Sequence, residues 1–353
     1  MAELVGTIDP RRDNLSGNIS INRFASDVRA GRVQEVMTTS DFAFMADLID
    51  RGTKQGYLQE QVPVTWPMLG WRRDSATFED SRDYEINAAR LIPTVPAKGE
   101  YLPIDPTFAQ YDWHMAKYGC QWDVSWEAWL RDGRDLNLLR DYPMSWGLSA
   151  RYTREYVFTQ TRAASAVLFT AGQGNLWAQA DFASGDALLN AANLGEAIAQ
   201  LRSFTDPAGN VAAYLGPLYL VVPPALEFTA KQLVNSQYNM GGLGVTSENN
   251  TMYNAANVVV NHFLPTVDAV SGNQAWYLFC SPSLRPAVRY GYLRGYEEPE
   301  IFVKEADARA LMGGSTDPFE GSFATDDIEF KLRFTFGTGL VDWRGAFMSL
   351  GDT

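Results

Sequence analysis

Residues 118–132, Tyr-Gly-Cys-Gln-Trp-Asp-Val-Ser-Trp-Glu-Ala-Trp-Leu-Arg-Asp, contain the clearest structural pattern in the chain. Every second residue up to Trp126 is apolar, which predicts a half-buried β-strand. Upstream, the apolar residues occupy the odd positions instead: Tyr111, Trp113 and Met115. The alternation therefore shifts near Lys117. We expect there a bulge, or one strand that passes between two packing environments.

The same strand forms the second half of a long hairpin. A first extended run covers residues 84–92, and the tip between the two runs is rich in proline and glycine. A two-stranded hairpin whose tip has few aliphatic side chains cannot be buried on its own domain. We therefore expect the hairpin, about residues 83–119, to be covered by a neighbouring subunit.

A long helix is expected after the hairpin. A short helical turn over residues 125–132 precedes it, and Pro143 is tolerated in its first turn. Residues at spacings of three and four predict one face: Trp146, Ala150, Thr153, Val157, Gln160, Ala164 and Val167. We predict one continuous helix over residues 146–168 that packs on the strand 327–336 and stops before Gly172.

The remaining patterns predict a mixed α+β chain. Residues 1–40 are polar and predict an arm without a core of its own, and Asp41 caps a helix that ends near Gly52. From about residue 186, helices and buried strands alternate. The expected helices cover 185–202 and 224–235, and the expected strands cover 217–223, 257–264, 274–280, 300–304, 327–336 and 337–343.

Composition limits the possible partners. The chain has 353 residues, with 29 Lys plus Arg against 42 Asp plus Glu, a formal net charge of −13. So acidic a surface disfavours tight general binding to nucleic acid and docking on anionic membranes. The two cysteines form no CxxC pair, which fits a reducing compartment without disulfides. The N-terminal residues lack a signal-peptide pattern, so we expect a soluble protein that is intracellular at synthesis.

The sequence offers little catalytic chemistry. It has only two histidines, His114 and His262, and no zinc, calcium, dinucleotide or P-loop motif. We expect no catalytic residue, metal or cofactor. One enzymatic alternative stays open: Asp123 and Glu127 lie among tryptophans, as in a carbohydrate-active hydrolase that uses a carboxylate pair.

Four phrases carry a family resemblance. They are Lys117-Tyr-Gly followed by Ser125-Trp-Glu-Ala128 and Asp135-Leu136, then Leu220–Ser236, then Arg294-Gly295 with Pro299, and finally Asp327–Gly337 with Val341–Gly345. In this order, over roughly residues 40 to 350, the chain resembles the major capsid proteins of tailed bacteriophages. The closing phrases are similar to those of Mu-like head subunits.

The resemblance implies the Hong Kong ninety-seven type of capsid fold. The segments would then be an N-terminal arm (1–40), a helix and irregular lead-in (41–82) and an extended loop (83–119). A peripheral domain with the spine helix (120–185), an axial domain (186–299) and closing strands of the peripheral domain (300–353) would follow. The implied role is structural and not enzymatic: an icosahedral shell around double-stranded DNA, located in the virion and assembled in the host cytoplasm. An encapsulin-like protein compartment is the alternative within the same fold.

The resemblance also implies partners. Hexamers and pentamers of the chain would enclose DNA without binding it tightly, and a portal, a maturation protease and possible cement proteins would join them. Some relatives begin with a long helical scaffolding segment, whereas only about 40 polar residues precede the first helix here, so a separate scaffolding protein is expected. Lys98 lies at the hairpin tip, where some relatives form a Lys–Asn cross-link, but an ordinary surface lysine is the better interpretation. The candidate contacts with other subunits are Arg82, Asp83, Arg90, Lys98, Glu100, Tyr101, Asp105 and Trp113.

Overall fold

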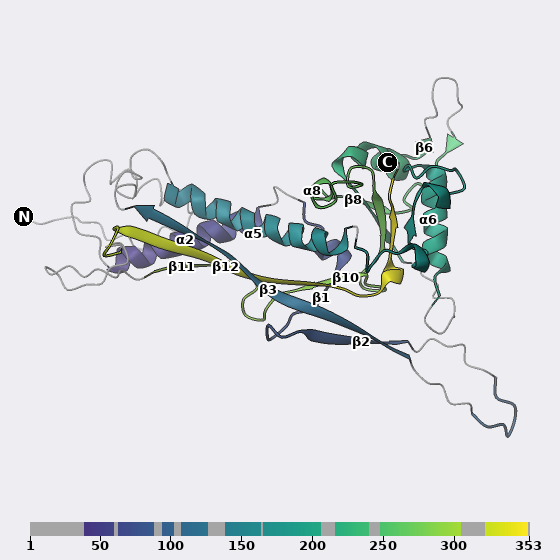
Figure 1. Ribbon diagram of the computed structural model, residues 1–353, viewed down its shortest axis with the longest axis horizontal. Helices are drawn as coiled ribbons and strands as arrows, with labels where there is room; N and C mark the ends of the chain where they lie inside the picture. Colours follow the sequence, from purple (N-terminus) through teal and green to yellow (C-terminus); the bar gives the residue numbers. More distant parts are fainter. Residues whose placement is uncertain are drawn as a thin grey trace, which may run out of the picture. The chain divides into compact units, whose positions relative to one another are not determined.

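A computed structural model describes residues 39–59, 63–87, 94–101, 107–125, 138–163, 165–205, 216–239, 248–304 and 322–351 (Figure 1). The chain divides into two compact units. Unit 1 comprises residues 1–58, 119–148 and 299–333, and unit 2 comprises residues 59–118, 149–298 and 334–353. The expected arm (1–40) and the helical turn after residue 125 lie almost entirely outside the described residues.

Two helices pack backbone to backbone in unit 1. They are α2 (Thr39–Leu58) and the first part of α5 (Leu138–Arg162). The prediction that the first helix ends near Gly52 is wrong, because α2 continues for six more residues. Its glycine at position 56 allows close packing: a β-carbon added at Gly56 would overlap the backbone of Met144 in α5. A glycine in this position therefore marks a contact rather than a helix end.

Strands and aromatic rings complete unit 1. Strand β11 (Glu300–Val303) pairs antiparallel with β12 (Asp327–Leu340), and Ile301 lies opposite Leu332. The ring of Trp122, in β3 (Thr107–Ser125), lies 4.1 Å from that of Tyr142 and 5.7 Å from that of Phe330, measured between ring centroids. Aromatic pairs at these separations contribute beyond the area they bury.

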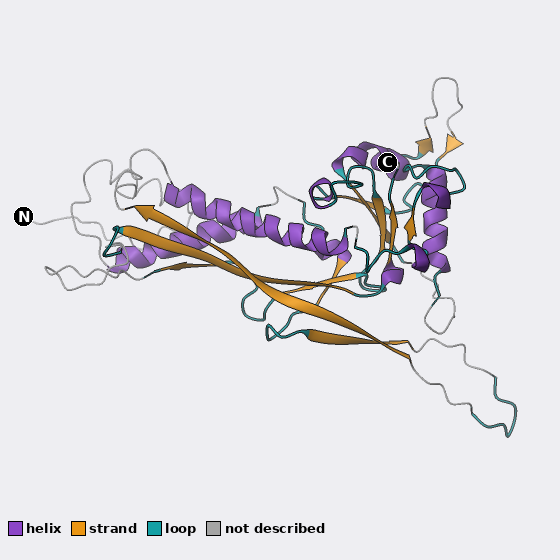
Figure 2. Cartoon of the chain, in the orientation of Figure 1, coloured by secondary structure: helices purple, strands orange, loops and turns teal. Residues whose placement is uncertain are grey.

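Unit 2 contains a five-stranded sheet in the order β4-β13-β9-β5-β8 (Figure 2). Its strands are β4 (Leu176–Trp177), β5 (Leu218–Val222), β8 (Asn257–Val260), β9 (Trp276–Cys280) and β13 (Ala346–Ser349). Strand β9 is buried throughout. Tyr277 and Phe279 belong to one core cluster and Trp276, Leu278 and Cys280 to the other, so the sheet lies between two apolar layers.

Helices cover this sheet. The long ones are α6 (Ala191–Ser203), which Figure 1 shows beside the strands, and α7 (Glu227–Asn235), which contacts β5 and β8. Asn190 caps α6, and its side chain accepts a hydrogen bond from the N–H of Asn193. The shorter elements of unit 2 are α3 (Trp66–Leu69), α8 (Leu264–Val267) and the pair β6 (Tyr238–Asn239) and β7 (Glu248–Asn249). Single 3₁₀ turns cover Ala171–Gln173, Gln179–Asp181, Pro224–Leu226 and Trp343–Gly345.

The second sheet has the order β1-β10-β12-β3-β2, with β11 on β12. It adds β1 (Gly70–Arg72), β2 (Ser81–Asn87) and β10 (Val288–Gly291). The shift in the apolar alternation of β3 is confirmed: Trp113 and Met115 are buried before it, and Trp122 and Val124 face inward after it. The shift coincides with the boundary between the two units, after Tyr118. The strand therefore passes between two packing environments.

The spine helix differs from the prediction at its end and in its buried face. Helix α5 ends at Arg162 rather than continuing to residue 168, and Val167 is 73% exposed. The fully buried positions are partly polar: Ala150, Arg154, Glu155, Phe158, Thr159 and Arg162. Apolar spacing missed this face because its charged residues have buried partners.

Most other predicted elements are present, with ends shifted by up to six residues: the helix predicted over 185–202 begins at Ala191, and the strand predicted over 257–264 ends at Val260. Residues 327–340 form one strand rather than two, and β13 was not predicted. No helix in the described part of the chain is long and apolar enough to cross a bilayer.

Candidate functional site

The candidate site is the hairpin that β2 forms with the first part of β3. The two strands pair antiparallel, from Ser81 opposite Trp113 to Asn87 opposite Thr107. Strand β2 ends the sheet order, so β3 is its only strand partner among the described residues. Residues opposite each other share a face, and the faces alternate along the ladder.

One face of this ladder is exposed. Arg82 lies opposite Asp112, 3.7 Å from Nε to the carboxylate, and both side chains are more than half exposed. Tyr84, two residues further along the same face, is 62% exposed. Exposed pairs of this kind stabilise a fold by about 0–1 kcal/mol. The face therefore has a minor role within its own subunit.

The described part of the tip is also exposed. The N–H of Gly99 donates to the carbonyl of Pro96 at 2.8 Å, and Lys98 within this turn has a φ of 67°. Lys98 and Glu100 are exposed, and Tyr101 is 86% exposed. A lysine in the left-handed region is uncommon, because a β-carbon is strained there.

The opposite face of the ladder is buried. Asp83 is 7% exposed and forms ion pairs with Arg289 and with Arg73, while Trp113 is 4% exposed. These two candidates thus face their own subunit, whereas Arg82, Lys98, Glu100 and Tyr101 face outward. Arg90 and Asp105 lie outside the described residues.

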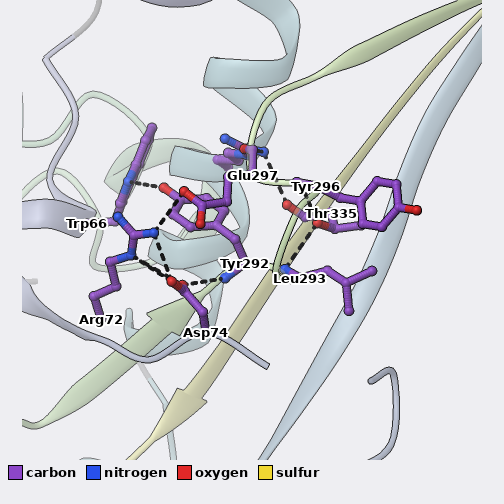
Figure 3. A network of polar contacts seen from close by, with 9 residues as sticks. Trp66, Arg72, Asp74, Tyr292, Leu293, Tyr296, Glu297 and Thr335 are labelled. Carbon is purple, nitrogen blue, oxygen red and sulfur yellow. Dashed lines mark hydrogen bonds and ion pairs between the residues drawn. The ribbon is translucent and has the colours of Figure 1, made fainter. Parts of the chain in front are cut away.

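A polar network joins β1, the segment that follows β10, and β12 (Figure 3). Arg72 donates to Asp74 at 2.8 Å and to Glu297 at 2.9 Å, and Asp74 in turn accepts the N–H of Tyr292. The hydrogen bond with Asp74 is the largest cause that raises the pKa of Arg72 above its ordinary value. The network ties β1 to the segment that follows β10.

Arg154 of α5 contacts the same region. It is fully buried, and its guanidinium donates to the carbonyl of Glu297 at 2.8 Å and to that of Thr335 at 3.2 Å. The same group lies 4.7 Å from the ring centroid of Tyr292, a cation–π distance. Local sequence patterns could not identify Arg154, since its hydrogen-bond partners lie more than 140 residues further along the chain.

A second buried network joins α5 to α3 and to the end of β8. Glu155 accepts the backbone N–H of Thr65 at 2.7 Å and the side-chain amide of Asn261 at 2.7 Å. Burial raises the pKa of Glu155 above its ordinary value, against the opposing effect of Arg162. Burial likewise lowers the pKa of Arg162. This network is structural, because both groups are enclosed.

The described residues show no assembled catalytic set. Asp123 is exposed and accepts a hydrogen bond from Gln121, and its proposed partner Glu127 lies outside the described residues. His114 is exposed beside Asp80, with 2.9 Å between Nδ1 and the carboxylate. No group of three His, Cys, Asp or Glu side chains in the described ranges could hold a metal ion.

Comparisons place the chain among phage capsids. The sequence profile of the family described as "Phage capsid protein" matches residues 111–349. No curated protein sequence matches the chain. The solved capsid structure of the cyanophage P-SCSP1u is 12% identical, covers 90% of each chain and has a TM-score of 0.50. A chain of Mycobacterium phage Ogopogo is also 12% identical, covers 89% of this chain and 99% of its own, and has a TM-score of 0.47.

The cyanophage likeness is one of fold, and it agrees with an α+β chain that has two sheets, a spine helix and a long hairpin. The matches give no support to an encapsulin-like compartment or to a hydrolase. The fold is the Hong Kong ninety-seven type, and the protein is a structural subunit of a multi-subunit shell in the virion. Because the family match covers more than half of the chain, this protein belongs to the phage capsid protein family, as the major capsid protein of a tailed phage.

Proposed function

We propose that the chain forms hexamers and pentamers of an icosahedral shell, and that the β2–β3 hairpin is the contact that each subunit places on its neighbour. The observation that carries this proposal is the two-faced hairpin. One face is buried on its own subunit through Asp83 and Trp113, and the other face and the tip are left exposed with large aromatic side chains.

Tyr84 and Tyr101 support an intersubunit role. Tyrosine is enriched at protein interfaces because its ring buries a large area at low entropic cost while its hydroxyl remains hydrogen-bonded. Lys98 and Glu100 beside Tyr101 add charges of both signs to the tip. Their contribution within one subunit is small, but the same contact would recur at every subunit of a shell.

The shell is proposed to enclose double-stranded DNA without binding it tightly, because a net charge of −13 disfavours phosphate contacts. The proposed partners are a separate scaffolding protein, a portal, a maturation protease and possible cement proteins, with assembly in the host cytoplasm. The proposed role includes no catalysis.

The test combines subunit stability with particle yield. In the variants Lys98→Glu and Tyr101→Ser, the melting of unassembled subunits should stay within about 0.5 kcal/mol of the parent, since both side chains are exposed. Electron microscopy should show fewer particles, or particles that dissociate at lower temperature. Normal yield and normal heat resistance in both variants would show that the hairpin tip is not an assembly contact.

A further inference from the structure

Trp113 is seated over a pair of glycines at the root of the hairpin. Gly291 of β10 and Gly337 of β12 lie opposite each other in the sheet. A β-carbon added at either position would lie 2.8 Å from the indole ring of Trp113. At Gly291 the added carbon would also overlap the backbone carbonyl of Arg73, and at Gly337 it would lie equally close to the carbonyl oxygen of His114, so both positions are too crowded for a side chain. The two glycines therefore leave the space into which the indole ring of Trp113 packs.

Arg289 packs against the same indole ring. It is fully buried in β10, and its guanidinium carbon lies 5.7 Å from the ring centroid of Trp113 and 5.7 Å from that of Trp71. The same guanidinium forms an ion pair with Asp83 of β2, and Arg73 approaches that carboxylate to 3.2 Å from its Nε. Arg289 thus contacts both strands of the hairpin, β3 through Trp113 and β2 through Asp83.

The position of these contacts along the ladder determines how the hairpin is oriented relative to the rest of unit 2. Trp113 lies at the inner end of the ladder, opposite Ser81, and Asp83 lies two residues further out on the same face. Beyond this point β2 is bonded to β3 alone among the described residues. A two-stranded ribbon twists more strongly than a wide sheet and is only marginally stable by itself. Its direction therefore depends on how its root is fixed.

We propose that Arg289 is a positioning residue that fixes the direction of the hairpin through Trp113 and Asp83, so that the tip is presented in one orientation to a neighbouring subunit. The presentation to a neighbour rests on the proposed function above; the fixed direction rests only on the contacts within the subunit. Loss of the Asp83 carboxylate removes the side-chain contact that holds β2 to Arg289, while Trp113 stays in place. Loss of the Arg289 guanidinium removes its contacts with both strands.

Distance measurements between two spin labels test the proposal in unassembled subunits. One label is placed at the tip through Lys98→Cys, and the other on the exposed face of α6 through Ala199→Cys, with the exposed Cys120 replaced by serine. Both sites belong to unit 2. Cys280 is buried and remains in place. Pulsed electron–electron double resonance then measures the distribution of distances between the two labels, and its width reports how uniformly the tip is oriented.

The variants are Asp83→Asn, Arg289→Met and Arg289→Lys, and the matched control is Asp112→Asn. Asp112 is an exposed carboxylate on the opposite face of the same ladder. We expect the distribution to broaden at least twofold in Asp83→Asn and Arg289→Met, to narrow again in Arg289→Lys, and to match the parent in Asp112→Asn. If Arg289→Met does not fold, the comparison of the distance distributions of Asp83→Asn and Asp112→Asn tests the proposal by itself. A folded Asp83→Asn subunit with the parental distribution would overturn the proposal.

Particle yield separates this inference from the proposed function. A broadened distribution with reduced yield supports both. A broadened distribution with normal yield supports the positioning role of Arg289 and overturns the hairpin as an assembly contact. An unchanged distribution overturns the positioning role at any yield.

Discussion

Gly147 of α5 lies directly against Thr53 of α2: a β-carbon at Gly147 would overlap the carbonyl oxygen of Thr53. Thr53 is fully buried at this crossing, and its hydroxyl donates to the carbonyl of Ile49 at 3.0 Å. The two helices of unit 1 therefore meet without intervening side chains, and the hydrogen atom of Gly147 is required by packing rather than by backbone conformation.

We predict that Gly147→Ala destabilises the subunit even though alanine favours a helix by about 1 kcal/mol over glycine. Overpacking costs about 1–3 kcal/mol. Because the added carbon would overlap a backbone oxygen, which cannot move aside as a side chain can, we expect a cost near the upper end of this range, above the gain in helix propensity. The measurement is the midpoint of urea unfolding. Gly172→Ala serves as control, because a β-carbon at Gly172 meets nothing within 4 Å. Equal midpoints for the two variants would mean that α2 and α5 do not touch at Gly147.

The second prediction concerns two valines of the predicted helical face. Val157 is partly buried against the larger core cluster of unit 2, whereas Val167 lies beyond the end of α5 and is 73% exposed. Val157→Asp should lower the free energy of unfolding by a few kcal/mol, because it places a carboxylate against apolar partners. Val167→Asp should remain within about 0.5 kcal/mol of the parent. Soluble expression and urea unfolding of both variants provide the test, and loss of folding in Val167→Asp would contradict the observed end of the helix.

This pair of valines shows where sequence reasoning stops. Local alternation predicted β3 and its shift near Lys117, because a strand's pattern depends on the faces that it presents. The buried face of α5 could not be predicted in the same way. Arg154 and Glu155 are buried only because the carbonyl of Glu297 and the N–H of Thr65 lie beside them in the fold. Such distant partners leave no periodic signal in one sequence.

The hairpin root was only partly predictable for the same reason. Charged and aromatic residues of the hairpin were identified as contact candidates, but the sequence did not indicate which of them face inward. Asp83 is buried because it forms an ion pair with Arg289, and Trp113 is buried because its ring packs against Gly291 of β10 and Gly337 of β12. These partners lie about 200 residues further along the chain. The exposed candidates stay predictions for the assembled shell.

The third prediction concerns the two free cysteines. Cys120 is exposed and Cys280 is 2% exposed, and burial raises the pKa of the Cys280 thiol to about 12 from 9.0. Because the thiolate is the reactive species, a maleimide at pH 8 should modify Cys120 and spare Cys280 in folded subunits. Mass spectrometry of the modified protein, with urea-unfolded protein as control, gives the extent at each site. Rapid modification of Cys280 in the folded subunit would contradict its burial.

The same thiol gives a pH dependence with a defined sign. The folded state holds the Cys280 proton more tightly than the unfolded chain, so this contribution is complete below pH 9 and is lost as the pH rises toward about 12. At pH 10 the loss should be about 1.4 kcal/mol relative to pH 8. Cys280→Ala should lack this component, so the difference in unfolding free energy between parent and variant should shrink by that amount. A constant difference across this pH range would exclude the shift.

The last prediction concerns Glu155 and Arg162, which lie seven residues apart on the buried side of α5. Glu155 accepts hydrogen bonds from the N–H and hydroxyl of Thr65 and from the side-chain amide of Asn261. Glu155→Gln preserves the shape but turns an NH₂ group toward these donors, so at least one buried donor loses its acceptor. We expect the free energy of unfolding to fall by about 1–3 kcal/mol.

Two comparisons separate this buried network from ordinary surface pairing. Glu297→Gln removes the carboxylate from an exposed pair with Arg72 and should change stability by no more than about 1 kcal/mol. Arg162→Met removes the buried cation near Glu155 and should also be destabilising, since it leaves the carboxylate without a counter-charge. If the two charges depend on each other, the double variant Glu155→Gln with Arg162→Met should lose less than the sum of the single losses, by 0.5 kcal/mol or more, roughly the lower limit for residues in one network. Strict additivity in this cycle would mean that Glu155 and Arg162 stabilise the fold independently, and that the hydrogen bonds from Thr65 and Asn261, rather than the charge pair, account for the loss in Glu155→Gln.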